Sequence, residues 1–171
     1  MSDADAVDLV LFVFRCGIGA VIATHGVNHI GLRGEKIAGT AGWFGSMGMR
    51  PPLAQAWLAS IAEIGAGLLL VLGLLTPFGA GTLLGVMAVA FVIAHRDKGF
   101  FIFNPGQGWE YVATLGLCAL AIGTVGPGAW SVDAAIDLDL TGSTGLVVTT
   151  AAGFGGAVVL LAACWRPERA A

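Results

Sequence analysis

The sequence predicts an all-α membrane protein, built as a four-helix transmembrane bundle with a fifth transmembrane helix. Hydrophobic residues make up 57% of the 171-residue chain and charged residues only 11%, with a mean hydropathy of +0.87. A soluble domain carries about 25% charged residues, so this composition excludes one. Five apolar runs are long enough to cross a bilayer, and the basic residues gather on alternate connections between them.

The spans are predicted in order over residues 7–30, 53–75, 78–95, 109–125 and 145–165. Only Thr76 and Pro77 separate the second span from the third, so these two should form a tight antiparallel hairpin. Residues 1–140 then form the four-helix bundle, and residues 141–171 form the extra helix with its tail. The first residues lack a basic region before the apolar run, so we expect a retained span and not a cleaved signal peptide.

Charged residues divide the predicted connections into two sides. The N-terminus, the turn at 76–77 and the loop 126–144 carry six aspartates and no lysine or arginine. The opposite side carries seven basic residues: Arg33, Lys36, Arg50, Arg96, Lys98, Arg166 and Arg169. The positive-inside rule therefore predicts an external N-terminus and a cytoplasmic C-terminus in a bacterial inner membrane.

The loop 31–52 is long for a connection within a bundle. Trp43, Phe44 and Met47 recur in it at helical spacing, which favours a short helix at the membrane interface with Trp43 at headgroup level. The alternative is an irregular glycine-rich loop.

Two ionisable side chains fall near the middle of the predicted membrane. Arg15 lies about 12 Å from the outer end of the first span, and Glu63 lies about 15 Å from the inner end of the second. An isolated charge at this depth is costly, so Arg15 and Glu63 are predicted to form an ion pair between the two spans. The alternative is that both belong to a ligand or proton site.

A second polar cluster is predicted at the inner boundary, where it could bind quinone, lipid or a partner. His25 and His29 are four residues apart and share a helix face. Hydrogen bonding between helices, without a cofactor, is the alternative. Haem and transition metals are disfavoured because HExxH and CxxCH motifs are absent, so no metal site is predicted. The predicted cluster comprises His25, His29, His95, Trp109 and Glu110.

The sequence shows no arrangement typical of an independent catalyst. It has no visible nucleophile–base pair and no phosphate-binding loop, so catalytic residues stay unassigned. The three cysteines lie far apart within apolar runs and are predicted to be buried apolar residues.

Seven short motifs occur in an order that resembles the DoxX family of small bacterial membrane proteins. They are Arg15 in the first span, the pair His25–Gly26, WFGSMGM before two prolines, EIGAGLLLVLGLLTP, His95 followed by GFF, NPGQGWEY and GPGAWSVD. Together they extend over about residues 7–133. The resemblance implies a compact four-helix membrane bundle.

The resemblance also implies a link to redox and oxidative-stress functions, because the family takes its name from a thiosulfate:quinone oxidoreductase. In actinobacteria it implies a membrane anchor for a superoxide dismutase and sulfurtransferase assembly. We therefore expect an accessory or anchoring subunit of a membrane redox complex that contacts quinone or lipid. The alternatives are a quinone-linked oxidoreductase in its own right and a small-solute or ion transporter. Expected partners are membrane lipids, other redox subunits or a second copy of the chain, and no nucleic acid.

The chain departs from the family pattern at two places. His29 stands near the position where members usually have lysine, so His25 is expected to belong to the shared polar cluster and His29 to be this protein's own variation. The fifth span is the second departure. Its small residues predict close helix packing, either within the bundle or against a partner helix: Ala152, Gly153, Gly156 and Ala157.

Overall fold

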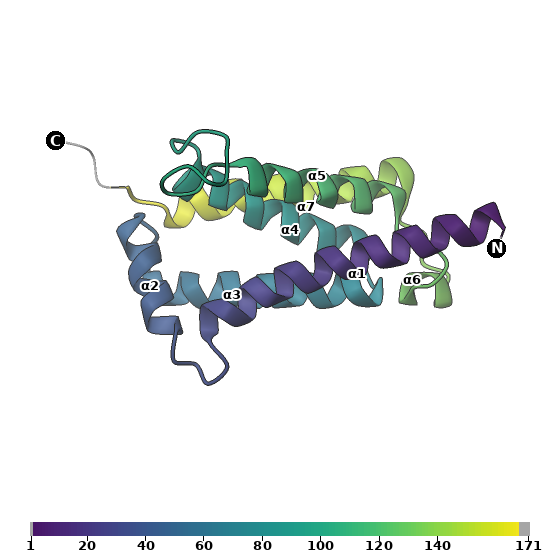
Figure 1. Cartoon of the computed structure of the whole chain (residues 1–171), viewed down its shortest axis with the longest axis horizontal. Helices are drawn as coiled ribbons and strands as arrows, with labels where there is room; N and C mark the ends of the chain where they lie inside the picture. Colours follow the sequence, from purple (N-terminus) through teal and green to yellow (C-terminus); the bar gives the residue numbers. More distant parts are fainter. Residues whose placement is uncertain (1, 168–171) are drawn as a thin grey trace.

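The computed structural model describes residues 2–167, whose regular elements are all helices (Figure 1). Five long or medium helices run lengthwise, while two short ones lie at opposite ends of the bundle. The elements in order are α1 (Asp3–Ile30), α2 (Ile37–Ser46), α3 (Pro52–Leu72), α4 (Thr76–Ala90), the π-helical turn η1 (Phe91–His95), α5 (Glu110–Val125), α6 (Val132–Ala135) and α7 (Gly142–Cys164).

Four helical segments are long and apolar enough to cross a membrane, which confirms the predicted multi-pass fold. They are Asp3–Ile30, Pro52–Leu72, Thr76–His95 and Gly142–Cys164. The predicted fourth span is present as α5, an apolar helix of 16 residues, or about 24 Å. It is thus shorter than the usual span length, although it lies alongside α4 and α7 between the two ends of the bundle (Figure 1).

Glycines allow α1 and α3 to pack closely. A Cβ atom added to Gly67 would lie 2.5 Å from the Gly19 carbonyl oxygen, and one added to Gly26 would lie 2.7 Å from the Ser60 carbonyl oxygen. Neither contact is possible for a larger residue without separating the helices. The approach brings the last turn of α1 beside the middle of α3, where Glu63 lies.

Small residues also join α4 to α7. A Cβ atom added to Gly85 would lie 3.0 Å from the Gly153 carbonyl oxygen, and the Thr149 hydroxyl donates to the Pro77 carbonyl at 3.2 Å. Gly153 and Ala157 are buried in this interface. The four small residues were predicted to pack either within the bundle or on a partner helix. Gly153 and Ala157 pack within the bundle, and a Cβ atom added to Gly81 of α4 would lie 3.0 Å from the Cβ of Ala152.

The loop between α1 and α3 contains the predicted short helix, α2, which crosses one end of the bundle (Figure 1). Phe44 is buried against α3, while the neighbouring Trp43 is about half exposed. The turn after α2 is tied to the end of α7. The Trp165 indole donates to the Met47 carbonyl at 2.9 Å, and the Arg50 amide donates to the Cys164 carbonyl at 2.8 Å.

Candidate functional site

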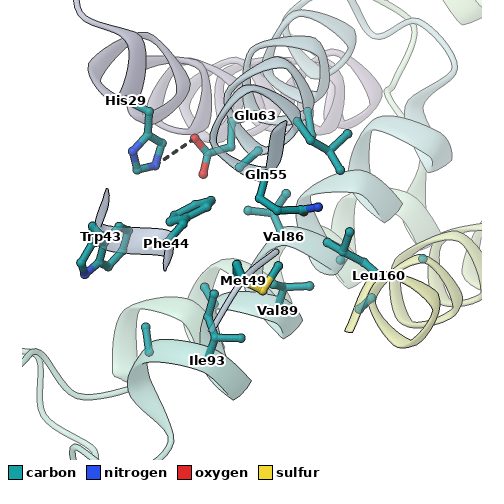
Figure 2. Close-up of a pocket in the computed structure, with 18 residues that line it drawn as sticks. His29, Trp43, Phe44, Met49, Gln55, Glu63, Val86, Val89, Ile93 and Leu160 are labelled. Carbon is teal, nitrogen blue, oxygen red and sulfur yellow. Dashed lines mark ion pairs between the residues drawn. The ribbon is translucent and has the colours of Figure 1, made fainter. Parts of the chain in front are cut away.

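A cavity of about 160 Å³ lies between α3, α4 and α7, with α1 and α2 closing one end (Figure 2). Most of its wall is apolar, and three polar side chains reach it: His29, Gln55 and Glu63. The complete lining is His29, Trp43, Phe44, Met49, Gln55, Leu58, Ala59, Ala62, Glu63, Gly85, Val86, Val89, Ala90, Ile93, Ala94, Gly156, Ala157 and Leu160.

Glu63 is a buried acid on this wall, with only 5% of its surface exposed. Its Oε2 atom lies 3.4 Å from Nε2 of His29, close enough for an ion pair when the histidine is protonated (Figure 2). Within residues 2–167, no group donates a hydrogen bond to the same oxygen. An ionisable group at membrane depth with unused hydrogen-bonding capacity is a candidate functional site.

His29 reaches Glu63 from the last turn of α1, and aromatic residues of α2 hold its ring. The imidazole stacks on Trp43 with centroids 6.4 Å apart and an interplanar angle of 21°. It also meets the edge of Phe44 at 6.1 Å. Figure 2 shows these two aromatic rings on the same side of the cavity as the ion pair. The polar pair is therefore set at one aromatic end of an otherwise apolar space.

The predicted ion pair between Arg15 and Glu63 is wrong. Glu63 lies beside His29, whereas Arg15 binds backbone carbonyls at the other end of α3. The Arg15 guanidinium donates to four backbone carbonyls: those of Leu70, Val71, Pro127 and Trp130. Leu70 lies seven residues beyond Glu63, about two helical turns further along α3. Carbonyls at a helix C-terminus lack intrahelical partners and attract a cation, which explains why the end of α3 holds the guanidinium.

Asp133 completes that distant end and was not singled out by sequence reasoning. Its carboxylate accepts hydrogen bonds from the Leu75 amide at 2.7 Å, the Thr76 amide at 3.0 Å and the Thr76 hydroxyl at 2.8 Å. It thereby caps the first turn of α4. The motif GPGAWSVD thus stabilises the turn between α3 and α4 through Asp133, its last residue. The motif was the only feature of the sequence that pointed to Asp133.

The five residues of the predicted inner cluster do not meet in one place. His25 contacts the Tyr111 hydroxyl at 3.0 Å, whereas His29 faces Glu63. His95 is instead fixed to the following loop, where the Gln107 carbonyl accepts from its Nδ1 at 2.8 Å.

Trp109 ends that loop and Glu110 begins α5, and both side chains contact the loop. The Glu110 carboxylate accepts from the Ile102 amide at 3.1 Å, and Trp109 packs edge-on against Phe91 and Phe100. Of the predicted cluster, only His29 lines the cavity. The other four side chains contact Tyr111 of α5 or residues in and around the loop before α5.

The arrangement is suited to a small, flat, mainly apolar group with a polar edge. An engineered apolar cavity of about 150 Å³ binds benzene, so 160 Å³ accommodates one ring. Glu63 and His29 could exchange hydrogen bonds or a proton with polar atoms on that ring. Within residues 2–167, no three His, Cys, Asp or Glu side chains gather closely enough to hold a metal ion.

Comparison with known families bears on the half of the chain that builds most of this site. The family model described as DoxX matches residues 10–96, just over half of the chain. This chain belongs to the DoxX family. The DoxX match contains α2, α3, α4 and η1 together with His29 and Glu63, whereas the α7 wall of the cavity lies outside it. The comparisons with curated proteins and with solved structures gave no match.

Proposed function

We propose that this DoxX-family protein binds the ring of a quinone in the cavity as an accessory subunit of a membrane redox complex. The observation that carries the proposal is the buried Glu63 carboxylate beside His29, whose Oε2 atom accepts no hydrogen bond and which faces an apolar, ring-sized space. A quinone ring needs apolar walls for its faces and donors for its carbonyl oxygens. Protonated Glu63, or the N–H of His29, supplies such a donor.

Redox chemistry gives the pair a second use. Reduction of a quinone to a quinol takes up two electrons and two protons. A carboxyl group and an imidazole can each hold and release a proton, so Glu63 and His29 are chemically suited to pass protons to the ring oxygens. The electrons would come from an associated redox subunit, which is the reason for assigning an accessory role to this chain.

The walls favour a quinone over the headgroup of a phospholipid. A phosphate group needs several donors or cations, but the lining offers one imidazole and one amide, and it contains an acid. The amide, Gln55, already donates to the Arg50 carbonyl at 3.4 Å. The cavity therefore suits a neutral ring with one or two carbonyl oxygens.

The proposal places the cavity toward the cytoplasmic side of a bacterial inner membrane. Its support is that, within residues 2–167, the connections at this end carry six basic residues and those at the other end carry none. Labelling in intact cells with a membrane-impermeant maleimide tests it, on a background without the native cysteines. Cysteine at Ser2 should react and cysteine at Ser46 should not; the reverse would overturn the orientation.

Quinone binding can be measured in lipid nanodiscs with a chainless benzoquinone, which quenches tryptophan fluorescence. Wild-type protein should show saturable quenching that depends on Trp43. Glu63→Leu should weaken binding roughly 2- to 10-fold, because leucine offers no donor to the ring and a neutral hydrogen bond contributes about 0.5–1.5 kcal/mol. The control is Glu110→Leu, because the Glu110 carboxylate accepts from the Ile102 amide outside the cavity. Unsaturable quenching, or equal affinity in both variants, would refute the quinone site.

The accessory role has a separate test. Quinone reduction should require other subunits in native membranes and disappear when this chain is purified alone. Equal turnover by the isolated protein would instead support the alternative of an independent quinone-linked oxidoreductase.

A further inference from the structure

We propose that the ligand enters from the side, through an opening between α3 and α7, and that it carries a hydrocarbon chain that lies in this opening. The inference rests on the proposed function and narrows it. The site would take a membrane-borne ring amphiphile: its ring fills the cavity and its chain extends into the bilayer.

The cavity has a polar end and an apolar end. His29 and Glu63 lie at the end closed by α1 and α2, while Leu160 of α7 lies across the cavity from them (Figure 2). A ring bound with its polar atoms toward Glu63 therefore directs its opposite edge toward α7. An amphiphile with one polar and one apolar end matches this polarity.

The apolar end opens outward. Leu58 of α3 and Gly156 of α7 both line the cavity and are both exposed, Leu58 by 48%. Leu58 lies about 9 Å from the start of α3, and Gly156 lies about 12 Å from the end of α7. These positions lie well inside two membrane-spanning helices, so the opening faces lipid chains and not water.

The size of the cavity explains why a chain would lie in the opening. A volume of about 160 Å³ is filled by a single ring. A substituent of several carbons must then leave the cavity. On the side away from the polar pair, the opening beside Gly156 faces the bilayer.

Gly156 also provides a clean way to close the opening. A Cβ atom added there meets no atom within 4 Å, so a larger side chain does not disturb the bundle. Because Gly156 lines the cavity, that side chain would stand in the opening. The neighbouring Gly155 is equally free of contacts and exposed but does not line the cavity, which makes it a matched control.

The test compares two benzoquinones with the same ring, one without a chain and one with a ten-carbon chain, using quenching in nanodiscs. Gly156→Leu should weaken binding of the chain-bearing quinone at least tenfold and change that of the chainless quinone less than threefold. Gly155→Leu should leave both unchanged, and both variants should unfold at the wild-type temperature.

Three outcomes would overturn the inference. If Gly156→Leu binds the chain-bearing quinone as the wild type does, the chain does not use this opening, while the quinone site itself stands. If it weakens both quinones equally, leucine fills the cavity and the chain has no place there. If the wild type binds neither quinone, the proposed function fails first.

Discussion

Replacing Arg15 with methionine removes a buried guanidinium that donates to four backbone carbonyls at one end of the bundle. Methionine fills much of the same space but offers no donor. The Leu70 carbonyl keeps a partner, because the Gly73 amide also donates to it at 3.1 Å. The Val71 carbonyl keeps only the Cys16 thiol, a weak donor at 3.5 Å, and the carbonyls of Pro127 and Trp130 lose the guanidinium donor.

The cost follows from those three acceptors. Each buried polar group left unsatisfied costs about 1–3 kcal/mol, so three such groups cost about 3–9 kcal/mol. The lower part of this range is the better guide, because methionine recovers some apolar burial and the Cys16 thiol still donates to the Val71 carbonyl. We therefore expect Arg15→Met to lower the free energy of unfolding by about 3–5 kcal/mol. Arg15→Lys keeps the charge but not the planar fork of donors, so its loss should be smaller.

Unfolding is measured by titrating sodium dodecyl sulfate into mixed micelles and following helical circular dichroism. Arg33→Met is the control, because Arg33 is exposed in the connection after α1 and such a change should stay within about 0.5 kcal/mol. A loss below about 1 kcal/mol for Arg15→Met would contradict this role for Arg15. It would mean that water or other donors satisfy the carbonyls without the guanidinium.

Two further predictions concern helix packing and the connection after α1. Gly67→Ala should lower the unfolding free energy by about 1–3 kcal/mol in the same titration, because its Cβ would lie 2.5 Å from the Gly19 carbonyl oxygen. Gly65→Ala should not, since nothing lies within 4 Å there; equal losses would contradict the packing argument. Backbone N–H groups of Glu35 itself and of Arg33 lower the pKa of the Glu35 carboxyl. The resulting stabilisation is therefore present above the ordinary pKa of glutamate and lost as pH falls through the lower folded value. Carbon-detected NMR measures the pKa of the Glu35 carboxyl. A pKa equal to the ordinary value for glutamate would contradict this prediction.

Hydropathy was sufficient to predict the helices, because a bilayer requires long apolar segments whatever their packing. It could not predict how far each helix extends along its neighbour. Counting about 1.5 Å per residue along each span puts both Arg15 and Glu63 near the membrane centre. Glycine contacts instead bring the last turn of α1 beside Glu63, and the 28-residue α1 then carries Arg15 to the far end of the 21-residue α3.

The candidate site was only partly predictable for a related reason. The spacing of His25 and His29 puts both on one face of α1, but it does not reveal which neighbour each one meets. Their partners, Tyr111 and Glu63, come from different helices. The α7 wall was missed because Gly156 has no side chain that could signal a binding role, and its spacing indicated helix packing alone.

The two buried charges show how the same residue class can serve the fold in one place and a ligand in another. The Arg15 guanidinium is fully engaged by carbonyls, so removing it leaves unsatisfied groups behind. Glu63 is the opposite case, since its buried Oε2 lies 3.4 Å from His29 but accepts no hydrogen bond, so its burial is poorly compensated. Replacing Glu63 removes that cost, and Glu63→Leu should unfold no more easily than the wild type in the titration used for Arg15. A protein that keeps its stability and loses its quinone affinity would locate Glu63 in the binding function, whereas a loss comparable to that of Arg15→Met would show that it holds the bundle together.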